Sequence, residues 1–491
     1  MSEQAVAAID VGSSAVKGVV LSHTGEVLAE HEVALFTNRP AHHQVEQDPQ
    51  AWWRACQLLV QAWRQSGVDL STLRALSLSG QMQDLVLTRQ GVAGGPAILY
   101  SDTRAEQEEA ELAGLLGTDP AQATGNPHSG ASVLPKLLWL KRHQPAALLG
   151  RPRLHVGAKD VLIERLCGAH VTDHTTAATT GLYALGRSSW LAEWIWTLEL
   201  GVQLPALRWP TDLAGRIHAE AAAELGLPLN LPVLTGIGDA GATALGAGQA
   251  QIGERHIYLG TSGFIGVVTR PDAASHPGVF RLPLLSAAEV LAVAPLTNAG
   301  SVWRWAAQVF AGGDDAALEA LVRHATPATL LCLPYLAGER SPVNDPQARG
   351  VYFGLGVETG PGDLARAALE GVAYALKATA EQLQASGGEA VTLLGGGSRS
   401  QAWCQIVADV LGSDALVPQR ASLLPVLGSA YPAFAFLGWS ESLAAYRQQV
   451  LDHQPAQHYR ADTARTDLYT AQFARFQQIY PAVRALFRVH L

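Results

Sequence analysis

Residues 231–248 read LPVLTGIGDAGATALGAG, and this stretch decides the fold. Pro232–Gly236 predicts the end of a buried strand, and Asp239–Gly246 predicts the start of a helix built of small residues. Because small side chains leave room, we expect this helix to pack closely against another backbone or a ligand. A glycine turn between strand and helix places one carboxylate, Asp239, at the helix N-terminus. Backbone amides and the helix dipole are expected to favour its ionised form there.

The stretch around Asp239 has to be weighed against other common motifs. Asp239 alone fits an ordinary helix cap, and Gly236–Gly241 also spells G-x-G-x-x-G, the pattern of a dinucleotide fold. That fold needs an acid at the end of the next strand, whereas Glu254 precedes that strand. The sequence contains no Gly-Lys dipeptide for a Walker A loop, no H-E-x-x-H and no G-x-S-x-G.

Size and composition predict a two-domain globular enzyme. The chain has 491 residues, 48% of them hydrophobic and 16% charged. Net charge is −9 and no dense Lys/Arg run occurs, so nucleic acid and anionic membranes are not expected partners. Four cysteines without a C-x-x-C pair argue against zinc and disulfide frameworks. Without a signal-peptide pattern or a bilayer-length apolar run, a reduced cytoplasmic enzyme is expected.

Two strand–turn–strand segments suggest related halves. Ala5–Ile9 and Ala15–Leu21 are predicted strands around a Gly-Ser-Ser turn, whose amides and hydroxyls are suited to phosphate. The alternative is a tight turn with serine chosen for turn chemistry. His256–Leu259 and Phe264–Val268 repeat the pattern around Gly260–Gly263.

Further along each half, polar or glycine-rich strand ends mark candidate ligand contacts. Gln83 and Asp102 follow predicted strands, where open α/β sheets place ligands, although a solvated loop or helix cap is the alternative. Gly395–Gly397 follows the strand Val391–Leu394 and precedes a helix reaching Leu411. Three glycines allow a flat ring to approach the backbone, so we favour ligand contact there.

These segments together resemble the FGGY family of carbohydrate kinases, and within it most closely the bacterial xylulokinases. Gly350–Leu355, then Asp363-Leu364 and Ala367–Glu370, match the family's second signature, and Gly338–Pro342 is similar to its GER-x-P loop. The resemblance extends from Ala7 to about Gly438, although only Pro135–Leu140 fits the first signature.

The resemblance implies an α/β protein of two actin-like (ribonuclease-H-like) domains flanking a central cleft. Residues 1–245 would bind sugar and residues 246–491 mainly the nucleotide. The implied reaction is ATP-dependent phosphorylation of a ketopentose such as D-xylulose to its 5-phosphate. Asp239 corresponds to the general base and Asp10 to the carboxylate near Mg²⁺. Expected sugar contacts are Met82, Gln83, Asp102 and Asp239. Candidate nucleotide contacts are Gly12, Ser13, Ser14, Lys17, Gly260, Thr261, Ser262, Gly300, Gly396, Gly397 and Ser398.

Most departures from the family pattern lie on the sugar side. Typical xylulokinases have His-Gly where this chain has Gln83-Asp84, and Asn where it has Ala240; their Trp-Asn-Asp becomes Tyr100-Ser101-Asp102. We therefore expect weakened or altered use of D-xylulose. A kinase for another ketose or polyol, and a catalytically weak sugar sensor, stay open as alternatives. The resemblance also suggests a homodimer.

Overall fold

Two α/β units make up the chain in the computed structural model, which describes residues 4–89, 91–249, 251–327, 330–385 and 390–488. The first unit comprises residues 1–250, 280–291 and 422–453, and the second comprises residues 251–279, 292–421 and 454–491. The domain boundary expected between residues 245 and 246 stays a prediction. Among the described residues, every helix is too short or too polar to cross a membrane.

The first unit is built on a sheet in the order β14-β15-β5-β1-β2-β3. Its strands are β1 (Ala5–Val11), β2 (Ala15–Ser22), β3 (Val27–Ala34), β5 (Leu73–Gly80), β14 (Leu213–Arg216) and β15 (Pro232–Leu234). β1 pairs antiparallel with β2 and parallel with β5. A short strand, β16 (Ile237–Gly238), also pairs parallel with β5. The predicted Gly-Ser-Ser hairpin is therefore confirmed as β1–β2.

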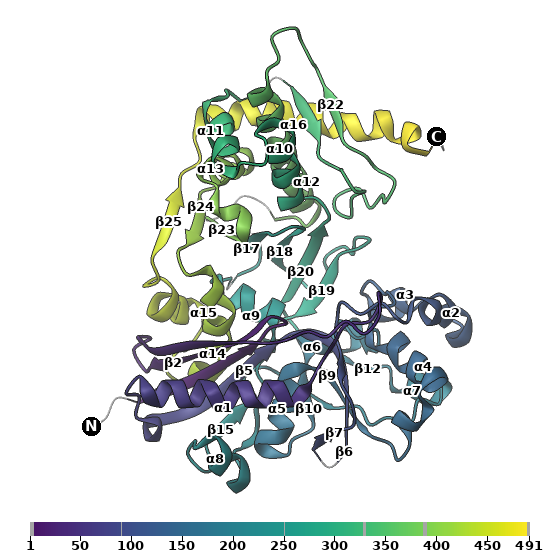
Figure 1. Cartoon of the computed structure of the whole chain (residues 1–491), viewed down its shortest axis with the longest axis vertical. Coiled ribbons are helices and arrows are strands. Elements are labelled where there is room, and N and C mark those ends of the chain that lie inside the picture. Colours follow the sequence, from purple (N-terminus) through teal and green to yellow (C-terminus); the bar gives the residue numbers. More distant parts are fainter. Residues whose placement is uncertain (1–3, 90, 250, 328–329, 386–389, 489–491) are drawn as a thin grey trace. The chain divides into compact units, whose positions relative to one another are not determined.

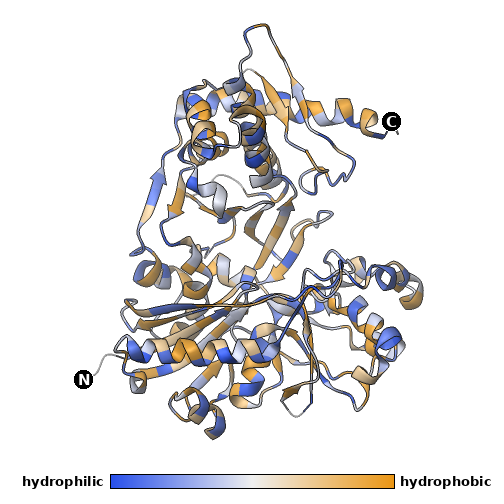
Figure 2. Cartoon of the chain, in the orientation of Figure 1, coloured by the Kyte–Doolittle hydropathy of each residue, from blue (hydrophilic) through white to orange (hydrophobic). Residues whose placement is uncertain are grey.

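Helices cover this sheet because its central strands are apolar on both faces, as the continuous burial of β1 shows. Helices α1 (Pro49–Gln65) and α5 (Ala158–Cys167) pack with Ala7, Ile9 and Val11 of β1. Figure 1 shows α1 running along the sheet, and Figure 2 shows apolar and polar residues mixed along this helix. One face of α1 is thus buried and the other is polar.

Helix α9 (Asp239–Gly246) packs against α14 (Leu424–Phe436) within the same unit. Added Cβ atoms on Gly246 and Gly428 would overlap the backbone of Leu424 and of Ala242, respectively. Glycine at these two positions lets the helix backbones touch. The expectation that the small-residue helix packs closely against another backbone is confirmed.

A smaller set of strands extends the first unit beyond its main sheet. β6 (Met82–Arg89) pairs antiparallel with β8 (Ala97–Ile98) and with β9 (Arg153–Gly157). Helix α4 (Val133–His143) packs on β6. β10 (Val171–Asp173) is followed by the short helix α6 (His174–Ala177) and lies beside β9.

The second unit repeats the pattern of the first. Its strands run in the order β20-β18-β17-β23-β24-β25, with β17 antiparallel to β18 and parallel to β23. The bounds are β17 (Arg255–Leu259), β18 (Gly263–Thr269), β20 (Val290–Leu296), β23 (Val391–Leu394), β24 (Ala415–Pro418) and β25 (Ala456–Tyr459). The main helices are α10 (Gly300–Phe310), α11 (Asp315–His324), α12 (Pro361–Gln382), α13 (Gln401–Leu411) and α16 (Thr463–Val483). The second predicted hairpin is confirmed as β17–β18.

Candidate active site

Asp239 is the first residue of α9, and Gly238 is the N-cap. The preceding strand β16 pairs with the end of β5, with Ile237 opposite Ser79 and Gly238 opposite Gly80. Strand and helix therefore meet at a sheet edge where ligands of α/β proteins commonly bind. Asp239 keeps part of its surface exposed, as a group that must reach a substrate requires.

Asp10 lies near the end of β1, on the other side of β5 from β16. Its partner across β5 is again Ser79, whose hydroxyl donates to Asp10 Oδ1 at 2.7 Å. Because neighbouring strands are about 4.8 Å apart, Asp10 and Ile237 are separated by roughly 10 Å. The sheet thus brings the two predicted catalytic carboxylates to one edge of the first unit.

Opposing effects act on the pKa of Asp239. Burial among protein atoms, with the charges of Asp10 and Asp173 adding to it, raises the pKa of Asp239 to about 7. The amide of Ala240 acts in the opposite direction and is outweighed. The helix N-terminus thus favours the ionised form, as expected, but burial and the two neighbouring carboxylates outweigh this effect. Burial likewise raises the pKa of Asp10, although Ser79 and Lys17 lower it.

Two predicted sugar residues, Met82 and Gln83, begin strand β6 close to the base. A Cβ on Gly238 would overlap Met82 Sδ, so Met82 packs directly against the residue before Asp239. Gln83 has a φ of 63°, which is uncommon for a residue other than glycine. Its amide Nε2 donates to Ser132 Oγ at 3.3 Å. The structure thus places Met82 against Gly238, the residue before Asp239, and Gln83 follows Met82 in β6.

Asp102 is engaged by the protein itself. Its carboxylate accepts from the Val45 amide at 2.6 Å and from Arg104 Nε and Nη2 at 2.9 and 2.7 Å. The side chain is fully buried. A sugar hydroxyl would have to share an acceptor that already has strong partners, so the role of Asp102 in sugar binding stays a prediction.

Sequence reasoning missed a buried acid–base pair beside Gln83. Asp84 Oδ1 accepts from the Tyr100 amide at 3.0 Å, whereas its buried Oδ2 has no hydrogen-bond partner. Burial raises the pKa of Asp84 well above its usual range, although Lys136 lowers it. Burial in turn lowers the pKa of Lys136 to about 8, and its Nζ donates to the Leu99 carbonyl at 2.7 Å. The signal in the sequence was the acid at Asp84 where typical relatives have glycine.

Sequence reasoning also missed a cluster of three buried charged side chains near the N-terminus of α9. Lys159 and Asp160 open helix α5, and Asp173 ends β10; all three side chains are fully buried. The available signal was the Lys-Asp pair at the head of an otherwise apolar segment, since unpaired charges are rarely buried.

The second unit contains a pocket of about 980 Å³. Five predicted nucleotide contacts line it: Gly260, Thr261, Gly300, Gly396 and Gly397. The Gly300 amide donates to the Gly260 carbonyl at 2.7 Å, and a Cβ on Gly300 would lie 2.5 Å from that oxygen. Glycine is therefore required where α10 meets the β17–β18 turn. The turn, the α10 N-terminus and the triple-glycine loop meet at one pocket.

Other predicted nucleotide contacts lie outside the residues that line this pocket. Ser262 and Ser398 belong to the second unit, and the Ser398 hydroxyl donates to the Gly395 carbonyl at 2.7 Å. Gly12, Ser13, Ser14 and Lys17 belong to the first unit, around the β1–β2 turn. Lys17 is opposite Asp10 in the hairpin, and its Nζ donates to the Ser422 carbonyl at 3.0 Å. Their contact with nucleotide stays a prediction.

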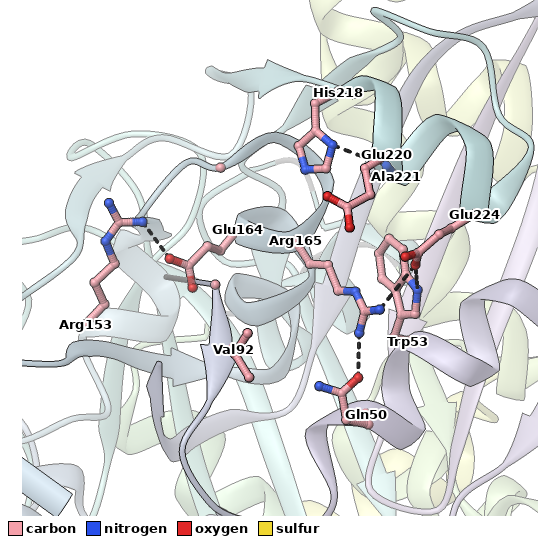
Figure 3. A pocket seen from close by; sticks show the side chains of 12 residues that line it. Gln50, Trp53, Val92, Arg153, Glu164, Arg165, His218, Glu220, Ala221 and Glu224 are labelled. Carbon is pink, nitrogen blue, oxygen red and sulfur yellow. Dashed lines mark hydrogen bonds and ion pairs between the residues drawn. The ribbon is translucent and has the colours of Figure 1, made fainter. Parts of the chain in front are cut away.

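A further cavity of about 360 Å³ lies in the first unit, away from the predicted residues. Figure 3 shows the Arg165 guanidinium over the Trp53 ring, with the centroid 4.2 Å away. Arg165 also donates to Gln50 at 2.6 Å and to Glu224 at 3.2 Å. Arg153 contacts Glu164 at 2.6 Å. These charges satisfy one another, which is typical of a polar surface depression.

Comparison with known proteins places this arrangement in a family. Models of the N- and C-terminal domains of the FGGY family of carbohydrate kinases match residues 5–246 and 256–436. Xylulose kinase of Escherichia coli (strain K12) is 33% identical, over 96% of this chain and 99% of that protein. Xylulose kinase of Klebsiella pneumoniae is 34% identical, over 97% and 99%. The crystal structure of xylulose kinase from Rhodospirillum rubrum has a TM-score of 0.88 at 26% identity, covering 99% of this chain and 100% of that one.

The predicted α/β fold of two actin-like units is thereby confirmed, together with the activity class of an ATP-dependent sugar kinase. Both family domains are present in this chain, and the Escherichia coli and Klebsiella pneumoniae relatives match it over nearly their whole length. The chain belongs to the FGGY family of carbohydrate kinases.

Proposed function

We propose that this kinase transfers the γ-phosphoryl group of ATP to D-xylulose, giving the 5-phosphate, with Asp239 as the general base. The observation that carries the proposal is the position of Asp239. It opens α9 next to Met82, at the sheet edge shared with Asp10. The choice of D-xylulose is supported by the names of full-length relatives.

Phosphoryl transfer requires the protein mainly to position the two reactants and to stabilise the charge on the transferring group. The sugar hydroxyl oxygen attacks the γ-phosphorus, and the bond from that phosphorus to the bridging oxygen breaks to release ADP. Asp239 accepts the hydroxyl proton as the new bond forms, and later passes it to solvent. Only the ionised form of Asp239 can do this.

The residues around Asp10 fit a magnesium ion. Mg²⁺ keeps several waters and takes one or two carboxylates together with substrate phosphates, so a closed set of protein ligands is not needed. Within the part of the chain that the structure describes, no three acidic, histidine or cysteine side chains form a metal cluster. Asp10 offers a hard oxygen donor of the required kind, with Oδ1 oriented by Ser79. When bound, Mg²⁺ would supply charge neutralisation on the phosphates.

The nucleotide would occupy the glycine-lined pocket of the second unit. A Cβ on Gly396 would meet nothing within 4 Å, so this position is open on the pocket side. A Cβ on Gly397 would lie 2.6 Å from the Trp403 ring, so this second glycine is required for packing. We infer that Gly396 faces the nucleotide and that Gly397 holds the loop against α13.

A second candidate substrate is another ketose or a polyol. The observation that favours it is the changed surroundings of the base. Gln83 is neutral at every pH and hydrogen bonds to Ser132, and Ala240 offers no amide side chain. The next residue, Asp84, is acidic where typical xylulokinases have glycine. The weak-sensor alternative is disfavoured because Asp10 and Asp239 are both present.

ADP release tests the proposal, using a panel of pentuloses, hexuloses and polyols with a coupled assay. We expect D-xylulose to give a clear signal above the blank without sugar. If another sugar gives the highest kcat/KM, the kinase assignment stands and the substrate changes. If no sugar raises ADP release, the proposed function is wrong.

A further inference from the structure

Three buried charges behind α9 have no part in the reaction as derived above. Lys159 Nζ lies 2.7 Å from Asp160 Oδ1 and 2.8 Å from Asp173 Oδ1. All three side chains are fully buried. Burying charges is costly even when they are paired, so the cluster calls for a role besides stability.

Asp173 connects this cluster to the helix that carries the base. Its Oδ2 accepts from the Gly238 amide at 3.4 Å and from the Thr176 amide at 3.1 Å. Its Oδ1 accepts from the Thr176 hydroxyl at 2.6 Å, in addition to Lys159. Gly238 is the N-cap of α9, directly before Asp239. One carboxylate from β10 therefore holds the backbone at the residue preceding the base.

The backbone at Gly238 is enclosed on two sides. An added Cβ would overlap Met82 Sδ and would lie 2.9 Å from Thr176 Oγ1. Met82 is a predicted sugar contact, and Thr176 is a partner of Asp173. Because this space is filled, a movement of Asp173 or Thr176 is passed to the peptide that carries Asp239.

Lys159 favours the ionised form of Asp173, in which the carboxylate accepts all of these hydrogen bonds. Burial raises the pKa of Asp173, but the charge of Lys159 and the hydrogen bonds of Lys159 and Thr176 outweigh it, so the net shift is downward. An ionised carboxylate offers acceptors only, and every group that contacts Asp173 here is a donor.

We propose that Asp173 is a positioning residue for Asp239, and that Lys159 fixes Asp173 in place. The proposal rests on the function of Asp239 as the base. It adds that Asp173 aligns the base through its hydrogen bond with Gly238, the residue before Asp239. A displacement of about 1 Å at a reacting group can cost about 100-fold in rate, so the alignment affects kcat.

The main test uses Asp173→Asn, which keeps the shape but replaces one acceptor oxygen by a donor. We expect kcat on the best sugar to fall by about 10- to 100-fold, with KM for ATP changed less than about twofold. Thr176→Val, which loses only the hydroxyl, should lower kcat by a smaller factor. Thr176→Ser keeps the hydroxyl and should restore kcat.

Glu164→Gln is the matched control. Glu164 lies on the same helix as Lys159, is buried, and contacts His155 at 2.8 Å and Arg153 at 2.6 Å. This variant should lower Tm while kcat stays within about twofold of the wild type. A lower Tm with unchanged kcat in folded Asp173→Asn, as in the control, would show a merely structural role and overturn the proposal. If Asp173→Asn does not fold, unchanged kcat in Thr176→Val overturns it equally.

Hydrogen exchange separates this proposal from the function it rests on, because it needs no sugar. Amide exchange over residues 237–243 should be faster by about tenfold in Asp173→Asn and Thr176→Val, and unchanged in Glu164→Gln. If the wild type phosphorylates no sugar, the proposed function fails. The exchange result then decides alone whether Asp173 holds this segment: faster exchange supports it, and unchanged exchange overturns it.

Discussion

Asp10 and Ile237 are both partners of Ser79, from opposite sides of β5. This register brings Asp10 and Asp239 to the same sheet edge, since Asp239 follows Ile237 by two residues. The charge of Asp10 is one reason why the pKa of Asp239 is raised to about 7, after burial.

The pH dependence of the reaction should report Asp239. Because the base must be ionised and its pKa is about 7, kcat/KM for the sugar should fall as pH decreases through 7. At about pH 6 it should be about tenfold below the plateau value. A pH series with the best sugar, at fixed ionic strength, measures this. A plateau that continues unchanged to about pH 5 would mean that Asp239 titrates normally or is not the base.

Gly396→Ala should weaken nucleotide binding without disturbing the fold. The added Cβ meets nothing within 4 Å, yet it stands in the pocket that the nucleotide would fill. KM for ATP should rise by about tenfold, with Tm and KM for sugar nearly unchanged. Gly356→Ala is the control, since a Cβ on Gly356 also meets nothing within 4 Å and Gly356 is outside the pocket lining. Equal KM for ATP in both variants would remove Gly396 from the nucleotide site.

Gln83→His combined with Ala240→Asn restores the pair of residues typical of xylulokinases. A histidine donates and accepts at different positions from a glutamine amide, and asparagine adds a partner near the base. We expect kcat/KM to rise for D-xylulose and to fall for any other sugar preferred by the wild type. If the wild type already prefers D-xylulose and the double change only lowers activity, the two departures are neutral replacements.

Asp84 should make stability depend on pH. Its folded pKa is raised well above the model-compound value of 3.8 by burial. Between these two pKa values the folded state holds a proton that the unfolded state has lost, so the free energy of unfolding decreases as pH rises. Asp84→Asn removes this dependence. Denaturant unfolding at several pH values from about 4 to 7 should show the variant gaining on the wild type as pH rises. A constant difference would contradict the raised pKa.

The sequence predicted those parts of the fold that depend on local pattern. The hairpins around Gly12–Ser14 and Gly260–Gly263, and the helix that starts at Asp239, follow from apolar strand runs and glycine-rich turns. The close packing of α9 followed from its small residues, although nothing local identified α14 as its partner.

The features that could not be predicted depend on the folded chain and leave no clear pattern in the sequence. The raised pKa of Asp239 arises from burial and from Asp10 and Asp173, which the fold brings to α9 from distant strands. The resemblance assigned Asp102 to the sugar, but the hydrogen bonds of its carboxylate with Arg104 and Val45 are seen only in the structure. The positive φ of Gln83 likewise has no sequence signal, because glutamine rarely adopts it.

The central claim is that Asp239 is the general base, and Asp239→Asn tests it most directly. We expect kcat on the best sugar to fall by about 10²- to 10⁴-fold, while the affinity for ATP and Tm change little. The measurement is single-turnover phosphoryl transfer at saturating sugar and ATP, with folding checked by circular dichroism. Turnover within about threefold of the wild type in the folded variant would contradict the claim and leave Asp239 as a helix-terminal residue.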